Sequence, residues 1–257
     1  MEKVPFPEFD LSGKVAIVTG AGRGMGYHFA LALARYGADL VICSRTISEL
    51  EKTKEEIEKL GRKALIQKVD VLRIPEIYSM VEEVVKAFSH IDILVNNAGV
   101  NIPQWAVDVN EEAWDRVIDT NLKALFFCAQ AVGKVMIRQK NGKIINISSQ
   151  TGTVAIPQRA AYCSSKGGVN QLTKVLAIEW AKYNINVNAI APTFIETPFS
   201  KPMFEKEGFR EFVLENIVLG RIGQPQDVIG ALIYLASEAS NFVTGHVLLV
   251  DGGWTAH

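Results

Sequence analysis

The stretch KVAIVTGAGRGMG, residues 14–26, joins a continuous apolar run of strand length to a loop that contains four glycines. Apolar residues then recur at Phe29, Ala30, Leu33 and Ala34 with the spacing of a buried helical stripe. Glycines let a backbone approach a ligand closely, and a helix N-terminus offers free N–H groups and a positive dipole end to a phosphate. Glycine-rich loops also serve as plain turns, so it is the placement between strand and helix that favours a dinucleotide site.

Outward from this stretch, short apolar runs alternate with helical patterns along the whole chain. We predict further strands at residues 39–44, 64–69, 91–95, 144–147, 185–190 and 246–250. Strands separated by helices form parallel sheets that are covered on both faces and bind ligands at the carboxyl ends of the strands. The length of 257 residues and the absence of a repeat or low-complexity tract predict one α/β domain over residues 1–257.

Composition and charge exclude several classes of function. The formal net charge is −1 and no block of Lys or Arg stands out, so nucleic acid is not an expected partner. The N-terminus lacks the apolar core of a signal peptide, and no apolar run approaches the length of a membrane span. The three cysteines, Cys43, Cys128 and Cys163, lack metal-type spacing. We therefore expect a cytoplasmic protein with no metal site.

The end of the second predicted strand indicates which nicotinamide cofactor is bound. An acidic residue there would bind the ribose 2′-hydroxyl of NAD. This chain instead has Ser44 and Arg45, and Arg23 lies in the glycine loop. Two guanidinium groups could converge on a 2′-phosphate, which predicts NADP(H) rather than NAD. The alternative is that both arginines are solvated surface residues.

A second stretch, residues 144–168, carries residues suited to proton transfer. A predicted strand ends at Ser149, and Tyr162 and Lys166 lie one turn apart on the helix that follows. A cation one turn away should stabilise the phenolate and lower the pKa of Tyr162, while the hydroxyl of Ser149 orients a substrate carbonyl. An isolated Tyr-x-x-x-Lys match is as well explained by a partly buried tyrosine and a solvated lysine, so the prediction depends on the rest of the chain.

Taken in order, the motifs resemble those of the short-chain dehydrogenase/reductase family over essentially the whole chain. They are Thr19–Gly26, Asp70-Val71, Asn96–Gly99, Asn121, Ser149 followed by Gly152, Tyr162-x-x-x-Lys166 and Asp251-Gly-Gly253. The resemblance implies a Rossmann-type, doubly wound three-layer sandwich with a seven-stranded parallel sheet. It also implies a catalytic group of Asn121, Ser149, Tyr162 and Lys166, in which the lysine holds the nicotinamide ribose and the asparagine supports a proton relay.

The same resemblance implies a set of cofactor-binding residues. Asp70 is expected near the adenine, Asn97 on the nicotinamide side and Thr197 at the carboxamide. The full set comprises Gly20, Arg23, Gly24, Met25, Gly26, Ser44, Arg45, Asp70, Val71, Asn97, Ala98, Gly99, Tyr162, Lys166, Pro192, Ile195 and Thr197.

One departure from the family pattern lies in the segment after the sixth predicted strand. Most relatives have Pro-Gly where this chain has Pro192-Thr193. A branched residue does not adopt positive φ cheaply, so Thr193 is expected to narrow the nicotinamide side of the pocket. Residues 193–220 are predicted to form a mobile substrate lobe, polar and aromatic from residue 199 onward.

The predicted reaction is reversible hydride transfer between NADP(H) and a secondary alcohol or ketone. The blocks at residues 177–181 and 250–256 resemble those of gluconate 5-dehydrogenase-like enzymes, which implies a sugar acid or polyol as substrate. Polar residues that could meet it are Asn101, Gln150, Gln158 and Arg159. The helices around Asn121 and Tyr162 resemble those through which relatives form dimers or tetramers, so a homo-oligomer is expected.

Three other functions are alternatives to the predicted sugar-acid or polyol dehydrogenase. A 3-oxoacyl-carrier-protein reductase shares nearly every motif and would need a basic patch for its acidic carrier; Lys201, Lys206 and Arg210 are candidates, but glutamates interleave with them. A general carbonyl reductase would share the same residues. A nucleotide-binding regulator without turnover is the third, and the intact set of Asn, Ser, Tyr and Lys argues against it.

Overall fold

The first strand, loop and helix form the unit that the sequence predicts. In the computed structural model, which describes residues 8–198 and 200–256, β1 (Val15–Thr19) is buried along its whole length and α1 (Gly24–Arg35) follows the glycine loop. Alternate residues of β1 face opposite sides: Ala16 and Val18 pack in one apolar cluster, Val15 and Ile17 in another. A strand buried on both faces must be apolar throughout, which explains the unbroken run in the sequence.

All seven strands pair in parallel in the order β3-β2-β1-β4-β5-β6-β7. The order reverses between β1 and β4, which leaves a crevice at the carboxyl ends of these strands. The remaining strands are β2 (Asp39–Ser44), β3 (Ala64–Lys68), β4 (Ile93–Asn96), β5 (Gly142–Ile147), β6 (Ile185–Pro192) and β7 (Val247–Val250). The predicted fold class is confirmed, with strand ends shifted by at most two residues.

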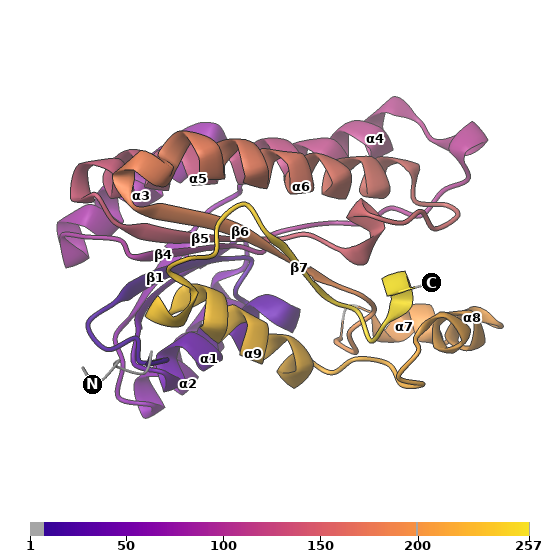
Figure 1. The fold of residues 1–257 in the computed structure, drawn as a ribbon, viewed down its shortest axis with the longest axis horizontal. Coiled ribbons are helices and arrows are strands. Elements are labelled where there is room, and N and C mark those ends of the chain that lie inside the picture. Colours follow the sequence, from indigo (N-terminus) through magenta and orange to yellow (C-terminus); the bar gives the residue numbers. More distant parts are fainter. Residues whose placement is uncertain (1–7, 199, 257) are drawn as a thin grey trace, which may run out of the picture.

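Helices cover both faces of the sheet and make three layers (Figure 1). The helices α1, α2 and α9 pack on one face, and α3, α5 and α6 on the other. The bounds are α2 (Ile47–Lys59), α3 (Ile74–Phe88), α4 (Glu111–Ile118), α5 (Ala124–Gln139), α6 (Ala160–Trp180) and α9 (Pro225–Ala236). The sheet thus holds the carboxyl ends of its central strands at one edge, between the N-termini of α1 and α6.

The long helix expected around Asn121 is interrupted. A π-helical turn, Asp119–Lys123, separates α4 from α5 and places Asn121 in its middle. Such a turn inserts one extra residue into the helix, and turns of this kind often occur at functional sites. Apolar periodicity alone did not reveal the insertion, because the buried stripe continues on both sides of it.

Two short helices, α7 (Lys201–Phe204) and α8 (Phe209–Asn216), form a lobe beside the carboxyl edge of the sheet (Figure 1). The lobe has its own apolar cluster, in which Phe194, Phe209 and Phe212 pack with Trp254 from the C-terminal turn. Residue Phe199, within the predicted substrate lobe, lies outside the described residues. The C-terminal turn is therefore part of the lobe and not a free end of the sheet.

Candidate active site

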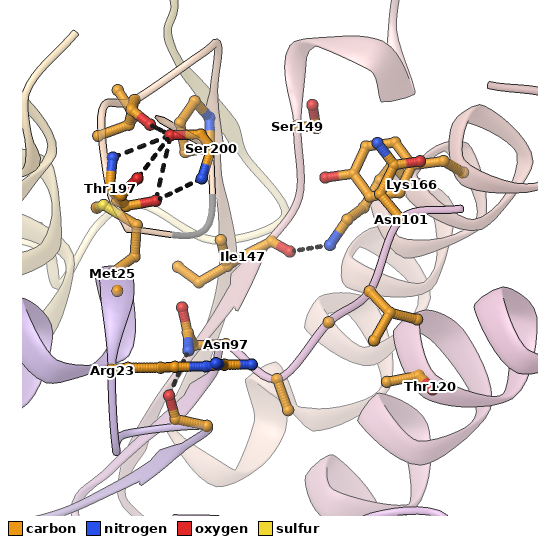
Figure 2. A pocket seen from close by; sticks show the side chains of 18 of the residues that line it. Arg23, Met25, Asn97, Asn101, Thr120, Ile147, Ser149, Lys166, Thr197 and Ser200 are labelled. Atoms are coloured by element: carbon orange, nitrogen blue, oxygen red, sulfur yellow. Dashed lines mark hydrogen bonds between the residues drawn. The ribbon is translucent and has the colours of Figure 1, made fainter. Parts of the chain in front are cut away.

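A cavity of about 390 Å³ runs along the carboxyl edge of the sheet, from the glycine loop to α6 (Figure 2). All but two of the predicted catalytic and cofactor-binding residues line it. The exceptions are Gly26 and Asn121. A Cβ added at Gly26 would collide with the carbonyl oxygen of Gly20, and Asn121 is fully buried. Both support the cavity wall from behind. The predicted residues lining the cavity are Gly20, Arg23, Gly24, Met25, Ser44, Arg45, Asp70, Val71, Asn97, Ala98, Gly99, Ser149, Tyr162, Lys166, Pro192, Ile195 and Thr197.

The glycine-loop end of the cavity suits an anion. Helix α1 begins at Gly24, its N-cap residue Arg23 makes no side-chain capping bond, and its first turn contains no acidic residue. The first N–H groups of the helix therefore keep their positive potential, which favours a pyrophosphate. Gly20 and Gly24 have φ angles of +67° and +57°, which other residues rarely adopt. The loop thus fits the dinucleotide that the fold implies.

The residues expected to select the cofactor meet at this same end, together with a carboxylate that the sequence analysis did not foresee. Ser44, Arg45 and Arg23 line the cavity, and so does Glu49 from the first turn of α2. Arg23 Nη1 lies 4.0 Å from Glu49 Oε1. A Cβ on Gly22 would lie 3.0 Å from Glu49 Oε2 and 3.2 Å from Ser44 Oγ. The strand end lacks an acidic residue, but the following helix supplies one.

The middle of the cavity is braced by backbone and amide contacts. Asn97 Nδ2 donates to the carbonyl of Thr19 at 2.9 Å, and the Thr19 hydroxyl accepts from the N–H groups of Asn97 and Ala98 at 2.9 and 3.0 Å. The glycine loop and the turn after β4 are thereby fixed to one another. On the opposite wall, Asp70 accepts from the N–H of Leu72 at 3.1 Å and presents itself with Val71 to the cavity.

Lys166 and Tyr162 stand together at the α6 end, as their spacing predicts. Lys166 is 4% exposed, and its Nζ lies 5.6 Å from the centre of the Tyr162 ring and donates to the carbonyl of Ile147 at 2.7 Å (Figure 2). Burial lowers the pKa of Lys166 to about 8. Burial also raises the pKa of Tyr162 to about 12, while Ser149 and Arg159 act in the opposite direction. The prediction that the pKa of Tyr162 is lowered is therefore wrong, because desolvation raises this pKa more than the nearby polar groups lower it.

Ser149 lies where β5 ends and a 3₁₀ turn, Gln150–Gly152, begins. Its hydroxyl donates to Gln150 Oε1 at 2.8 Å and accepts from the N–H of Thr151 at 3.2 Å. Gly152 packs this turn against α6, since a Cβ there would lie 2.8 Å from the carbonyl oxygen of Lys166. The glycine therefore keeps the serine close to the helix that carries Tyr162 and Lys166.

Asn121 connects three parts of the site. Its Oδ1 accepts from the N–H of Val100 at 2.8 Å, and its Nδ2 donates to the Val100 carbonyl at 2.9 Å and to Ser165 Oγ at 3.1 Å. A Cβ on Gly99 would lie 3.3 Å from Asn121 Oδ1 and 3.9 Å from Lys166 Nζ. The amide is saturated by protein groups, so it holds the loop after β4 against α6.

Thr193, the departure from the family pattern, is accommodated without backbone strain. The non-glycine residues with positive φ in the described part of the chain are Ser89, Lys140, Gln158 and Asn184, so Thr193 is not among them. Its side chain lines the cavity, and its Oγ1 has no hydrogen-bond partner among the described residues. The expected conflict with positive φ is wrong, because the backbone here does not enter the left-handed region.

The segment after Thr193 is held by its own hydrogen bonds. The hydroxyl of Ser200 donates to the carbonyl of Ile195 at 2.6 Å and lies 3.2 Å from Thr197 Oγ1 (Figure 2). Ile195 also pairs with Gly223, which has no space for a side chain beside it. The Thr197 hydroxyl is thus engaged inside the segment while its residue lines the cavity.

The polar residues predicted to meet a substrate divide into two groups. Asn101, Gln150 and Arg159 line the cavity, whereas Gln158 is exposed and has a φ of +64° that turns the backbone just before Arg159. The sequence analysis missed an apolar wall of Ile156, Phe194 and Met203. Nothing in the local pattern marked these three residues, since only the folding of the lobe onto the sheet brings them to the cavity.

The charged residues weighed for an acyl carrier lie elsewhere. Lys201 and Arg210 line a separate surface hollow together with Glu196 and Glu205, and Lys206 is exposed. Within residues 8–198 and 200–256, no group of three or more His, Cys, Asp or Glu side chains could hold a metal ion. In that same part of the chain, no helix is both long and apolar enough to cross a bilayer.

Comparison with known proteins agrees with the fold. A family model described as enoyl-(acyl carrier protein) reductase matches residues 20–255. The chain is 43% identical to the 2-dehydro-3-deoxy-D-gluconate 5-dehydrogenase of Escherichia coli (strain K12), over 96% of this chain and 98% of that protein. It is 42% identical to a 3-oxoacyl-[acyl-carrier-protein] reductase of Thermotoga maritima, over 95% of this chain and 98% of that protein.

A solved relative has the same architecture. The gluconate 5-dehydrogenase from Burkholderia cenocepacia J2315, crystallised in complex with NADP and tartrate, matches with a TM-score of 0.93 and 36% identity over 97% of this chain and 98% of that chain. Sheet order, glycine loop and cavity together define an oxidoreductase that uses a nicotinamide dinucleotide. The chain belongs to the short-chain dehydrogenase/reductase family.

Proposed function

We propose that this enzyme is an NADP(H)-dependent dehydrogenase that interconverts a secondary alcohol and a ketone in a sugar acid. The observation that carries the proposal is the position of Tyr162 and Lys166, at the far end of a cavity whose near end is the glycine loop. The relatives reported above include a 2-dehydro-3-deoxy-D-gluconate 5-dehydrogenase and a gluconate 5-dehydrogenase, both of which are named for sugar acids.

The residues that would hold the cofactor line the cavity. The glycine loop and the α1 N-terminus would receive the pyrophosphate, Asp70 and Val71 the adenine, and Lys166 the nicotinamide ribose. When bound, NADP(H) supplies or accepts the hydride. Ile195 and Thr197 would support the nicotinamide side.

Proton transfer would be performed by the protein. In ketone reduction Tyr162 donates its hydroxyl proton to the substrate oxygen, and the ammonium of Lys166 stabilises the phenolate that forms. Ser149 would exchange its bond to Gln150 for one to the substrate oxygen and so orient the carbonyl. Asn121 fixes the loop that lies beside Lys166. The tyrosine would regain its proton by way of Lys166.

The principal alternative is a 3-oxoacyl-carrier-protein reductase, since a relative of that name is 42% identical. A carrier of strongly acidic surface would need a basic patch, but the exposed Lys201 and Arg210 are interspersed with Glu196 and Glu205. The polar residues Asn101, Gln150 and Arg159 at the catalytic end of the cavity favour a polyhydroxylated acid instead. A general carbonyl reductase and a regulator without turnover are the remaining alternatives.

The proposed function is tested by nicotinamide absorbance on the purified enzyme. The substrates are D-gluconate, 5-keto-D-gluconate, 2-dehydro-3-deoxy-D-gluconate, D-glucitol and an acetoacetyl thioester, each assayed with both cofactors. We expect the highest kcat/KM on a sugar acid with NADP(H). Turnover confined to the thioester would establish the reductase alternative, and binding of NADPH with no turnover on any substrate would favour a regulator.

The cofactor preference should depend on the charged group at the near end. Arg45→Asp combined with Ser44→Ala is expected to lower the ratio of kcat/KM for NADP over NAD by about a hundredfold, because charge-assisted hydrogen bonds to a phosphate are lost and a carboxylate is added. Dissociation constants for both cofactors, measured by fluorescence, should move in the same directions. An unchanged ratio would contradict the assignment of NADP.

Glu49 provides a matched variant of opposite effect. Its carboxylate lies beside Arg23 and Ser44 and should repel a 2′-phosphate. The Glu49→Gln variant keeps the size of the side chain and should bind NADP(H) more tightly than the wild type, with little change for NAD.

We also propose that the chain forms a homo-oligomer, either a dimer or a tetramer, in the cytoplasm, with residues 193–220 as the substrate lobe of a single domain. Val175 and Ile178 on α6 are 48% and 79% exposed. These exposed apolar side chains support a contact between subunits. Light scattering coupled to size-exclusion chromatography tests the assembly.

A further inference from the structure

Arg159 is a buried cation that the mechanism above does not use. It is 7% exposed, stands at the N-cap of α6 three residues before Tyr162, and lines the same cavity. Its guanidinium carries five N–H donors, yet among the described residues it makes one hydrogen bond, from Nη1 to the carbonyl of Gln158 at 3.2 Å. It forms no ion pair with a carboxylate of the described residues.

A cation in this position is costly to the folded protein. A buried charge with few partners loses part of its hydration. Burial accordingly lowers the pKa of Arg159, although arginine remains charged at all ordinary pH values. A ligand that brings a carboxylate would accept hydrogen bonds from two of the unused donors and supply the missing counter-charge.

The backbone is shaped to hold Arg159 there. Gln158, a non-glycine residue, has a φ of +64°, in the left-handed region that such residues seldom occupy. Its carbonyl accepts from the N–H of Gln104 at 3.1 Å, and Gln104 forms a β-bridge with Arg159. Strained backbone of this kind persists only where its surroundings fix it, and it is concentrated at binding sites.

Unpaired polar atoms occur on the same lining. Asn101 Oδ1 and Thr151 Oγ1 are buried and have no hydrogen-bond partner among the described residues, and both side chains belong to the cavity wall. Figure 2 shows Asn101 at the Lys166 end of the cavity, far from Arg23. This end therefore combines the buried guanidinium of Arg159 with the polar residues Asn101 and Thr151 on the cavity wall.

We propose that Arg159 binds the carboxylate of the substrate and is the residue that makes this enzyme select acids over neutral polyols. The proposal rests on the proposed function and extends it, because it assigns the acid group to a specific side chain. Arg159 and Tyr162 lie within one turn of α6, a spacing of about 5 Å along the helix. An aldonate can place its carboxylate on the first and a carbon several atoms away beside the second.

The test uses a pair of substrates that differ only at carbon 1. D-Gluconate carries a carboxylate there and D-glucitol a hydroxymethyl group. In Arg159→Gln we expect kcat/KM for gluconate oxidation to fall about a hundredfold more than kcat/KM for glucitol oxidation, since charge-assisted hydrogen bonds to the carboxylate are lost. The loss of the effect of Arg159 on the pKa of Tyr162 is shared by both substrates. The Arg159→Lys variant, which keeps the charge without the planar fork, should recover part of the gluconate activity.

Binding supplies a second readout that does not depend on turnover. Calorimetric titration of D-gluconate into the enzyme saturated with NADPH, a combination that cannot react, should show a dissociation constant about a hundredfold higher for Arg159→Gln than for the wild type. The matched control is Arg210→Gln, an exposed arginine outside this cavity, which should bind gluconate as the wild type does. Thermal melting and NADP affinity verify that each variant is folded.

The outcomes separate this inference from the proposed function. Equal losses on gluconate and glucitol would show that Arg159 has only a structural role, and a wild type that binds gluconate no more tightly than Arg159→Gln would overturn the inference whatever the turnover assay shows. If the wild type reduced only the thioester but still bound gluconate through Arg159, the proposed function would fail while the anion site stood. A misfolded Arg159→Gln leaves the comparison to Arg159→Lys, which must show weaker gluconate binding with unchanged glucitol turnover.

Discussion

Tyr162→Phe is expected to lower kcat in both directions by about a thousandfold, because the variant has no hydroxyl proton to give or receive. The ring remains and packs as before, so the affinity for NADPH should change by less than about twofold, which fluorescence titration measures. Single-turnover reduction should be slowed as strongly as steady-state turnover, since the lost step is the chemical one.

The control for this variant is Tyr36→Phe. Tyr36 is 42% exposed at the C-terminal end of α1, away from the cavity, and removal of its hydroxyl should leave kcat unchanged. Retention of more than a tenth of wild-type turnover by Tyr162→Phe would show that another group transfers the proton, and the mechanism would have to be abandoned.

Lys166→Met should have two opposite effects, on catalysis and on stability. Turnover should fall about a hundredfold or more, because the cation that stabilises the phenolate is lost. At pH 7 the free energy of unfolding should fall less than the burial of Lys166 alone would suggest, because the substitution also removes a buried charge. Burial lowers the pKa of Lys166 from 10.5 to about 8, so holding its charge in the folded protein costs about 3 kcal/mol.

The stability difference between the wild type and Lys166→Met should change with pH in a definite direction. Below pH 8 both folded and unfolded wild-type chains carry the charge, and the full cost applies. Between about pH 8 and pH 10.5 the folded protein releases the proton before the unfolded chain does, so the wild type gains stability relative to Lys166→Met by up to about 3 kcal/mol. Reductive turnover of the wild type should fall over the start of the same range, as the cation disappears. Denaturant unfolding and kcat/KM, each measured from pH 7 to pH 10, test both statements.

Lys143 serves as the matched control. It too is buried, with a pKa lowered to about 8, but it lies outside the cavity and donates to Asn186 and Asn241 at 2.9 and 2.8 Å. Lys143→Met should leave turnover per folded molecule unchanged. A stability difference between Lys166→Met and the wild type that did not vary with pH would contradict the low pKa of Lys166.

The strands of this fold could be read from the sequence because the sheet is buried on both faces. Residues 40–43 are apolar in an unbroken run, and they form the buried middle of β2, whose ends at Asp39 and Ser44 match the prediction. The error at β4, predicted at 91–95 and found at Ile93–Asn96, arises because Ile91 is buried before the strand begins. Apolar character reports burial, which does not end where ladder pairing ends.

The site could be read in part. The motifs located Ser149, Tyr162 and Lys166 at one end of a cavity, but they gave no measure of desolvation, which decides the pKa of Tyr162. Glu49 enters the cofactor end from the next helix, and no spacing rule for the strand end includes it. Gln158 is exposed and its neighbour Arg159 is buried, because the positive φ of Gln158 turns the chain between them.

The C-terminal turn has a consequence for how substrate range can change within this architecture. Trp254 packs its ring at 5.6 Å from that of Phe194, and Phe194 is itself part of the cavity wall. This part of the cavity wall thus packs against the C-terminal turn, in addition to its connection to the end of β6. We expect substitutions in α7, α8 or the C-terminal turn to reshape this wall, while the cavity residues that follow β1 to β5 keep their geometry. The lobe can thus alter the shape of the cavity, whereas Arg159 and Tyr162, which stand together at the start of α6, stay in place.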